Sequence, residues 1–219
     1  MEKRFDSLTI FEFGQRGDTG IKKLRFQPQV VRGYQKGIKF LIQAKRKEDL
    51  FPFKSLNFEA LHGDKEGRYS IRANDQYRIE FTLSDNDDEP AVTICNIMEL
   101  SNHYKIMSTI NTLQPKTANK MMSSLLIHPG EMLKDEIAAR GITQKKLADE
   151  IGVSYSVFNE VLNGKRPITT EYALLLEAAL DTDANIWIGL QADYNMQKMR
   201  QDSSFMQRLR NIRKVAAVL

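Results

Sequence analysis

Residues 141–170 decide the fold of the C-terminal half, and they read GITQKKLADEIGVSYSVFNEVLNGKRPITT. Two short amphipathic segments, QKKLADEI and YSVFNEVLN, follow Thr143 and Ser154, residue types that cap helix N-termini. Between them Gly152 permits a tight turn and Val153 fills it. The pattern predicts a helix-turn-helix, whose second helix can enter a DNA major groove.

The second helix of this unit is expected to turn polar side chains outward while the first helix braces it. The competing interpretation is an ordinary small helical bundle with glycine-ended helices. The order Gln-x-x-x-Ala, Gly-x-Ser and Asn-Gly-Lys-Arg favours the helix-turn-helix. The residues expected to contact DNA bases or phosphates are Gln144, Ser154, Tyr155, Ser156, Asn159, Lys165 and Arg166.

Three further helices are expected around this unit. Pro129 suits the first turn of a helix over GEMLKDEIAAR, and Thr169 or Thr170 suits the N-cap of EYALLLEAAL. Another helix is expected from Ile186 to about Met199. The sequence therefore predicts an all-α domain over residues 125–200.

Three motifs around the central stretch resemble a known family. HPGEMLKDEI (128–137), NGKRPIT (163–169) and WIGLQADYNM (187–196) are similar to the HigA antitoxins, which have a lambda-repressor-like (Xre) helix-turn-helix. The resemblance implies a homodimer that binds operator DNA in its own promoter and neutralises a toxin. Asp181-Thr182 departs from the family, where a glycine turn is common, but the departure touches a helix end only.

The first half of the chain has a different character. Residues 29–46 place apolar side chains on one helical stripe, with Arg32, Lys36, Lys39 and Lys45 on the polar face. Alternating residues around 69–72, 77–83 and 91–97 predict three antiparallel strands. The expected fold is therefore α+β, with helices packed on a small antiparallel sheet.

Charge is unevenly distributed along the chain. The net charge is +4, yet residues 20–54 hold ten Lys and Arg against two acids, an excess of eight. This excess suits a polyanion, and equally a solvated helix face. The start of the chain has no apolar signal core, and Cys95 is the single cysteine, so we expect a cytoplasmic protein without disulfides, membrane contact or cofactor.

Four segments follow from these patterns. Residues 1–106 form the α+β domain, and 107–124 lack a sustained period and contain a proline, which indicates a linker or an arm. Residues 125–200 form the helical domain, and 201–219 form a charged, partly helical tail.

The first domain resembles the HigB toxins of the RelE superfamily. The similarity lies in LHGDKEGRYSIRANDQYRIEF (61–81) and SNHYK (101–105). It implies a RelE-like fold and a metal-independent endoribonuclease that cuts mRNA on the ribosome, held in toxin–antitoxin contact with the second domain. Such cleavage needs an acid, a base and fixed cations.

The candidate residues for that chemistry are few. Arg78 is expected to stabilise phosphate charge, unless it pairs with Glu80 or Glu99. His103 is the first choice as general acid or base, followed by Tyr104 and then His62. Lys65 and Arg68 are expected to bind the RNA backbone, and no metal site is expected because the three histidines lack ligand spacing.

Three functions follow from the combined pattern. The first is a toxin–antitoxin module in one chain, with mRNA and the ribosome as partners of one half and operator DNA as partner of the other. The second is a transcriptional regulator whose N-terminal domain is a non-catalytic interaction module. The third is an RNA-binding protein in which the basic face of residues 20–54 cradles RNA without cleavage.

Overall fold

The N-terminal half is built on an antiparallel sheet. The computed structural model describes residues 27–85, 93–102, 116–117 and 125–216. Successive strands along the chain are neighbours in the sheet, in the order β1-β2-β3-β4-β5. The strands are β1 (Glu59–Ala60), β2 (Arg68–Arg72), β3 (Tyr77–Asp85), β4 (Thr93–Asn102) and β5 (Lys116–Thr117).

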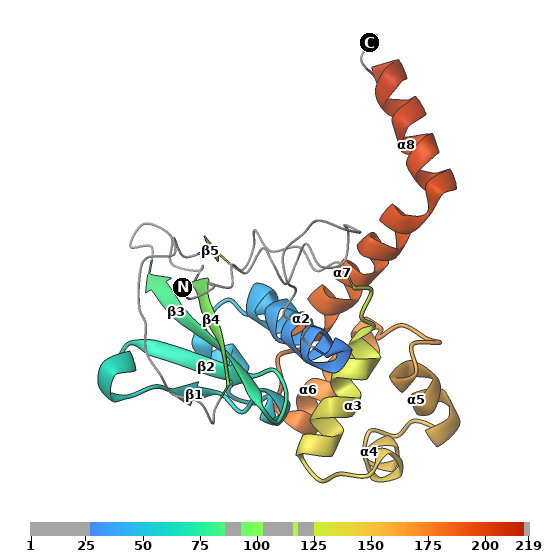
Figure 1. The fold of residues 1–219 in the computed structure, drawn as a ribbon. Helices are drawn as coiled ribbons and strands as arrows, with labels where there is room; N and C mark the ends of the chain where they lie inside the picture. The colour runs from blue at the N-terminus through green and yellow to red at the C-terminus, as the bar shows by residue number, and fades with distance from the viewer. Residues whose placement is uncertain (1–26, 86–92, 103–115, 118–124, 217–219) are drawn as a thin grey trace.

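Helix α2 (Pro28–Gln43) packs on this sheet, which confirms the expected α+β arrangement (Figure 1). Its apolar stripe is buried as the periodicity predicts. A Cβ on Gly37 would lie 2.5 Å from a methyl carbon of Ile79, so glycine is what lets helix and sheet approach closely. The described part of this half also contains three short 3-10 turns: η1 (Lys47–Leu50), η2 (Lys54–Leu56) and η3 (Gly63–Lys65).

The C-terminal half is helical throughout its described part. The predicted N-caps are confirmed, because the side chains of Thr143, Ser154 and Thr169 each accept a hydrogen bond from a backbone N–H three residues on. The helices are α3 (Pro129–Ala139), α4 (Gln144–Glu150), α5 (Tyr155–Leu162), α6 (Thr170–Leu180), α7 (Ala184–Gln201) and α8 (Ser203–Ala216).

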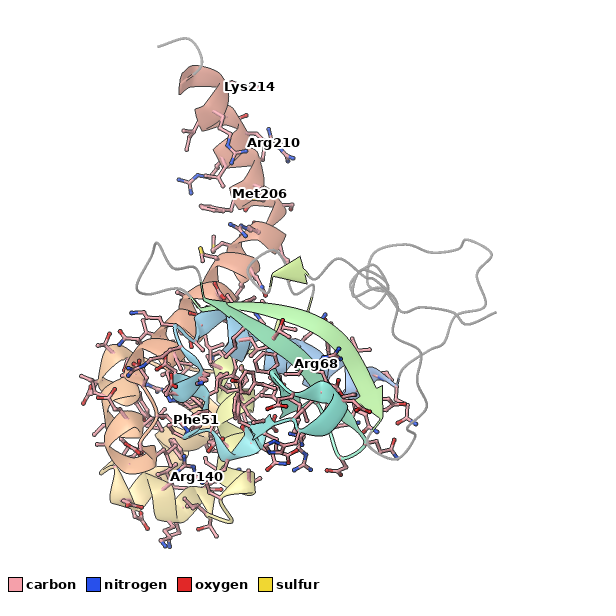
Figure 2. The ribbon with its side chains drawn as sticks, turned by 90° about the vertical axis from the view of Figure 1, so that its left-hand side faces the viewer. Phe51, Arg68, Arg140, Met206, Arg210 and Lys214 are labelled. Atoms are coloured by element: carbon pink, nitrogen blue, oxygen red, sulfur yellow. The ribbon has the colours of Figure 1, made fainter. Side chains whose placement is uncertain are left out.

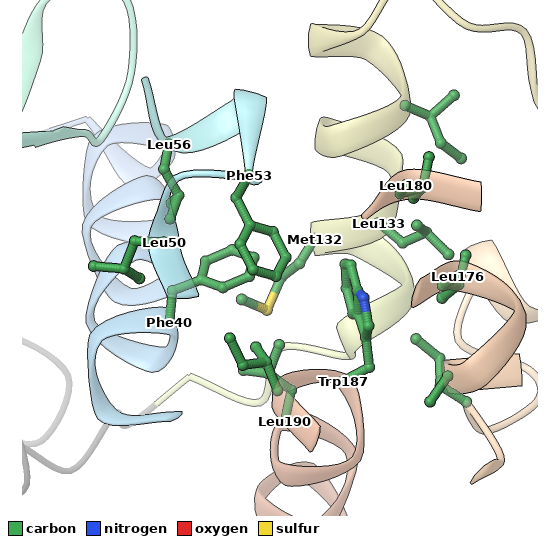
Figure 3. Packing of buried hydrophobic residues seen from close by; sticks show 14 of the residues in the cluster. Phe40, Leu50, Phe53, Leu56, Met132, Leu133, Leu176, Leu180, Trp187 and Leu190 are labelled. Carbon is green, nitrogen blue, oxygen red and sulfur yellow. The ribbon is translucent and has the colours of Figure 1, made fainter. Parts of the chain in front are cut away.

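The two halves share one hydrophobic core. Trp187 of α7 lies between them, with ring centroids 6.3 Å from Phe40 of α2 and 5.5 Å from Phe53 (Figure 3). Met132 of α3 lies against the same aromatic group (Figure 3). The buried cluster runs without a break from the sheet to α6, so the chain is not two separate bodies joined by a tether.

The structure adds detail to two expected segments. Within residues 107–124, the expected linker or arm, Lys116–Thr117 pairs with β4 as a fifth strand. The third strand also continues beyond the expected residue 97 to Asn102. Strand β5 lies at the edge of the sheet, and its pairing needs only backbone hydrogen bonds, which side-chain periodicity does not reveal.

The tail beyond residue 200 is helical as expected. Helix α8 projects from the body and extends away from the sheet (Figures 1 and 2). Phe205, Leu209 and Ile212 share one face, Arg208 and Arg213 flank it, and Arg210 lies on the opposite side.

Candidate nucleic-acid interface

Helix α5 is fixed in place by its buried side. Phe158, Val161 and Leu162 are fully buried in the shared core. The preceding helix α4 contributes Leu147 and Ala148, also fully buried, and the small Ala148 permits close approach of the two helices. This packing leaves the opposite side of α5 to solvent.

The outward side of α5 holds the residues predicted to read DNA. Tyr155 is 48% exposed, Ser156 is exposed and Asn159 is half-buried. Ser154 caps the helix, with its Oγ accepting from Val157 N at 3.3 Å, so this hydroxyl is held at the helix start. Gln144 begins α4 and is half-buried. The structure brings these five side chains to the α4–α5 unit.

Of the cations expected to hold phosphates, Lys165 is exposed in the loop after α5. Arg166 follows it but forms an ion pair with Glu160 of α5. Both side chains of that pair are more than a third exposed, so a phosphate can compete for the guanidinium at small cost.

Helix α3 braces α5 through direct backbone contact. A Cβ on Gly130 would lie 2.1 Å from the carbonyl oxygen of Val161, so only glycine fits there. His128 caps α3, its Nδ1 accepting from Gly130 N at 3.0 Å. The same ring lies edge-on to Tyr194, with centroids 4.7 Å apart, and close to Gly164 after α5. His128 therefore joins α3, α5 and α7.

The environment of His128 favours its neutral form. Burial lowers the pKa of this imidazole, the charge of Glu131 opposes that shift, and Lys198 adds to it. A neutral ring is also what the cap requires, because a protonated Nδ1 cannot accept from Gly130 N.

Three cations of the polar face of α2 are paired with the helical half, whereas the sequence predicted a solvated or RNA-binding face for residues 20–54. Arg32 binds Glu131 of α3 with both Nε and Nη2, and Lys36 Nζ lies 2.5 Å from Asp135. Lys39 is only 2% exposed and its Nζ lies 3.4 Å from Gln197 of α7. Sequence periodicity identified this face as polar but not which helix would cover it.

Glu136 of α3 connects the two halves from within the core. Its carboxylate is fully buried and accepts from the backbone N–H groups of Lys54 and Ser55, both at 2.9 Å. Arg140 donates to the same carboxylate at 2.7 Å and also to the carbonyls of Pro52 and Leu180. The buried charge is thus compensated by three donors from two segments.

Arg78, the predicted phosphate ligand, has intramolecular partners. Its Nε donates to Ser70 Oγ at 2.9 Å and its Nη2 to the carbonyl of Asn57 at 2.5 Å. Its ion-pair partner is Glu59, at 3.3 Å, whereas the sequence suggested Glu80 or Glu99 as alternatives to phosphate, and the side chain of Glu99 lies outside the described residues. The side chain is 11% exposed, and burial lowers its pKa while Glu59 raises it.

The other candidates of the N-terminal half are scattered. Lys65 Nζ lies 2.7 Å from Glu80 Oε1 and 2.8 Å from Oε2, and that carboxylate is almost fully buried. His62 is exposed and Arg68 is half-buried. His103 and Tyr104 lie outside the described residues. The described part therefore shows cations held by carboxylates, with no assembled acid–base pair among these residues.

Two residues of the interface were missed from the sequence. Lys134 of α3 donates to Asn163 Oδ1 at 2.6 Å, and Asn163 Nδ2 donates to Asn159 Oδ1 at 2.6 Å. The i,i+4 spacing of Asn159 and Asn163 was the available signal, since such residues are neighbours on a helix. The contact with α3 had no signal in the local pattern.

The described residues give no sign of a metal centre or a membrane span. They contain no group of three or more His, Cys, Asp or Glu side chains placed to hold a metal ion. None of their helices combines the length and apolar character needed to cross a membrane.

Two solved structures are similar to part of this chain. Pseudomonas aeruginosa antitoxin HigA, solved with the higBA promoter, is 29% identical, covering 40% of this chain and 91% of that chain with a TM-score of 0.35. PA4674 of the same organism, solved with its operator DNA, is 34% identical, covering 33% and 78% with a TM-score of 0.32.

A family model described as helix-turn-helix matches residues 133–187, which leaves residues 1–132 and 188–219 outside the match. Virulence-associated protein I of Dichelobacter nodosus is 36% identical over 77 residues, which cover 35% of this chain and 71% of that protein. Virulence-associated protein A' of the same organism is 32% identical, covering 33% and 64%. Through its C-terminal helices, this chain belongs to the helix-turn-helix family that includes virulence-associated protein I.

Proposed function

We propose that this protein is a sequence-specific DNA-binding regulator of the antitoxin type. The observation that supports it most is the α4–α5 unit, whose buried side is locked in the core while Tyr155, Ser156 and Asn159 face outward. A short, rigid, polar helix of this kind suits the major groove, and exposed lysines beside it suit phosphates. Family membership in the helix-turn-helix group supports the same reading.

In this proposal the N-terminal domain is an interaction module. Its basic helix α2 is docked against α3 through Arg32 and Lys36. This side of α3 lies away from the α5 residues that face solvent. The docking gives α3 a rigid support, and α3 in turn contacts the backbone of α5 at Val161. The N-terminal domain thus stabilises the DNA-reading unit instead of binding nucleic acid through α2.

The test is selection of binding sites by the full-length protein from a randomised DNA duplex pool. A two-fold dimer is expected to enrich an inverted repeat whose half-sites lie about 10–10.5 base pairs apart. Ser156→Ala and Asn159→Ala are expected to weaken or alter that preference. Lys165→Ala, the matched control, should weaken binding to all sequences alike. Absence of any enriched site would refute the proposal.

A second function, a toxin–antitoxin module in one chain, is favoured by the charge match between the halves. Arg32, Lys36 and Lys39 of α2 meet Glu131, Asp135 and Asp193 of the helical half. An inhibitor that covers an RNA-cleaving enzyme is expected to present such an acidic surface. The ribonuclease proposal assigns phosphate binding to Arg78 and proton transfer to His103, with Tyr104 and His62 as alternates.

Separate expression of the halves distinguishes the two functions. If the module is a ribonuclease and its inhibitor, residues 1–106 alone should arrest growth and residues 107–219 supplied separately should relieve the arrest. Arrest should also disappear with Arg78→Ala and His103→Ala. A soluble 1–106 fragment that neither arrests growth nor cuts ribosome-bound mRNA would leave the regulator as the function.

A further inference from the structure

A chain of hydrogen bonds from α3 holds the central polar side chain of the recognition helix. Lys134 Nζ donates to Asn163 Oδ1 at 2.6 Å. Asn163 Nδ2 in turn donates to Asn159 Oδ1 at 2.6 Å and to the carbonyl oxygen of Asn159 at 2.8 Å. Asn163 is the C-cap residue of α5, so its amide is also anchored to the last helical turn.

Lys134 determines the direction of these hydrogen bonds. An ammonium group has donors only, so the side chain of Asn163 must turn its oxygen toward Lys134. The NH2 group of Asn163 then faces Asn159, which must present its own oxygen as acceptor. The Nδ2 atom of Asn159 has no hydrogen-bond partner among the described residues, and this donor is the group left for an external ligand.

We propose that Lys134 and Asn163 orient Asn159 as a hydrogen-bond donor, and that this orientation sets which base the protein prefers. The inference rests on the proposed DNA binding and adds the chemistry of one contact to it. Lys134 and Asn163 are positioning residues, since Asn159 is the side chain that meets the base.

Base chemistry then defines the preference. An asparagine that recognises adenine in the major groove must donate to N7 and accept from the N6 amino group at once. Asn159 has its oxygen engaged by Asn163, so this bidentate arrangement is disfavoured. Guanine presents two neighbouring acceptors, N7 and O6, and no donor on that edge, which suits an asparagine that offers its NH2 group. We therefore expect guanine at the base that Asn159 contacts.

The experiment compares full-length variants by selection from the same randomised duplex pool. Asn159→Ala first identifies the base position that depends on Asn159, and wild type should prefer guanine there. Lys134→Met and Asn163→Ala release the amide of Asn159, so the guanine preference should fall about tenfold and adenine should gain. Lys134→Arg keeps a donor and should retain the wild-type preference.

A matched control separates orientation from charge. Lys145→Met removes one positive charge from an exposed position of α4 and should lower affinity for all duplexes without changing base preference. Helix content measured by circular dichroism verifies that every variant is folded. The inference is overturned if Lys134→Met keeps the wild-type guanine preference, or if the position sensitive to Asn159→Ala prefers adenine in wild type. Failure of wild type to enrich any site would instead refute DNA binding itself, and the inference with it.

Discussion

At the residue scale, buried polar side chains determine how the two halves fit. Lys39 belongs to the polar stripe of α2, yet it is buried against α7, where burial lowers its pKa and Asp193 raises it. Glu136 is buried among three donors. The sequence identifies both as polar, but their burial depends on partners 81 to 158 residues away in the chain, which no local pattern reports.

Glu136→Gln should be strongly destabilising. The amide keeps one acceptor oxygen but removes the charge that compensates Arg140, so we expect the free energy of unfolding to fall by about 3 kcal/mol. Guanidinium denaturation measures the difference. Glu171→Gln, at an exposed position of α6, is the control and should change stability by less than about 0.5 kcal/mol. Equal effects of the two substitutions would show that Glu136 does not join the halves.

His128 should make stability depend on pH. Its pKa is lowered in the folded protein, so the contribution of the neutral ring is complete above the unfolded value of about 6.5. As the pH falls below that value, the unfolded chain binds the proton first and stability decreases until the folded pKa is passed. The loss is expected to approach about 1 kcal/mol per pH unit.

His128→Asn tests this expectation because asparagine also caps helices but does not titrate. The free energy of unfolding, measured with denaturant, should decrease more steeply for wild type than for the variant between about pH 6.5 and pH 5. His62→Asn, at an exposed position, is the control and should keep the wild-type slope. Parallel pH profiles for wild type and His128→Asn would contradict the assignment.

At the scale of elements, caps and periodicity predicted the helices well. The three predicted caps at Thr143, Ser154 and Thr169 are confirmed, since each depends on contacts within one turn. The strand pair β4–β5 was missed because its hydrogen bonds join residues far apart in the chain. Local signals therefore identified which segments are helices, and failed where a backbone partner is remote.

The end of α6 offers a stabilising substitution. Asp181 has φ 56°, the left-handed conformation that the family's usual glycine would adopt without strain. That conformation costs residues other than glycine about 1–2 kcal/mol. Glycine removes this strain, but its greater flexibility in the unfolded chain offsets part of the gain. Asp181→Gly should therefore raise the free energy of unfolding by about 0.5–1 kcal/mol.

The control lies in the same helix. Ala178→Gly at an exposed interior position of α6 should lower stability by about 1 kcal/mol. Thermal or denaturant unfolding gives both values. A loss of stability in both variants would mean that Asp181 makes a contact worth more than its backbone strain.

At the scale of the whole molecule, the shared core makes the chain one cooperative unit. The single tryptophan, Trp187, packs on Phe40 and Phe53 of the other half, so its fluorescence reports their docking. Fluorescence and far-ultraviolet circular dichroism should lose signal at the same denaturant concentration. An earlier fluorescence change would show that the halves separate before they unfold.

Two phenylalanines test the same unit. Phe53→Ala should lower the free energy of unfolding by about 3–5 kcal/mol, because Phe53 is fully buried between the halves. Fluorescence and circular dichroism should report the same decrease. Phe51→Ala, at a largely exposed position two residues away, should have a much smaller effect. Composition and motif order predicted the fold classes of the two parts, α+β and all-α. The interface between them depends on three-dimensional packing, which the sequence does not show.

The central claim is that α5 reads DNA sequence. The most direct measurement is the ratio of dissociation constants of the full-length protein for its selected duplex and for a scrambled duplex of equal composition, at one physiological salt concentration. We predict a ratio of at least about 10³, as in specific DNA-binding proteins, falling sharply in Asn159→Ala. Equal affinity for both duplexes, or a ratio that Asn159→Ala and Ser156→Ala leave unchanged, would contradict the account.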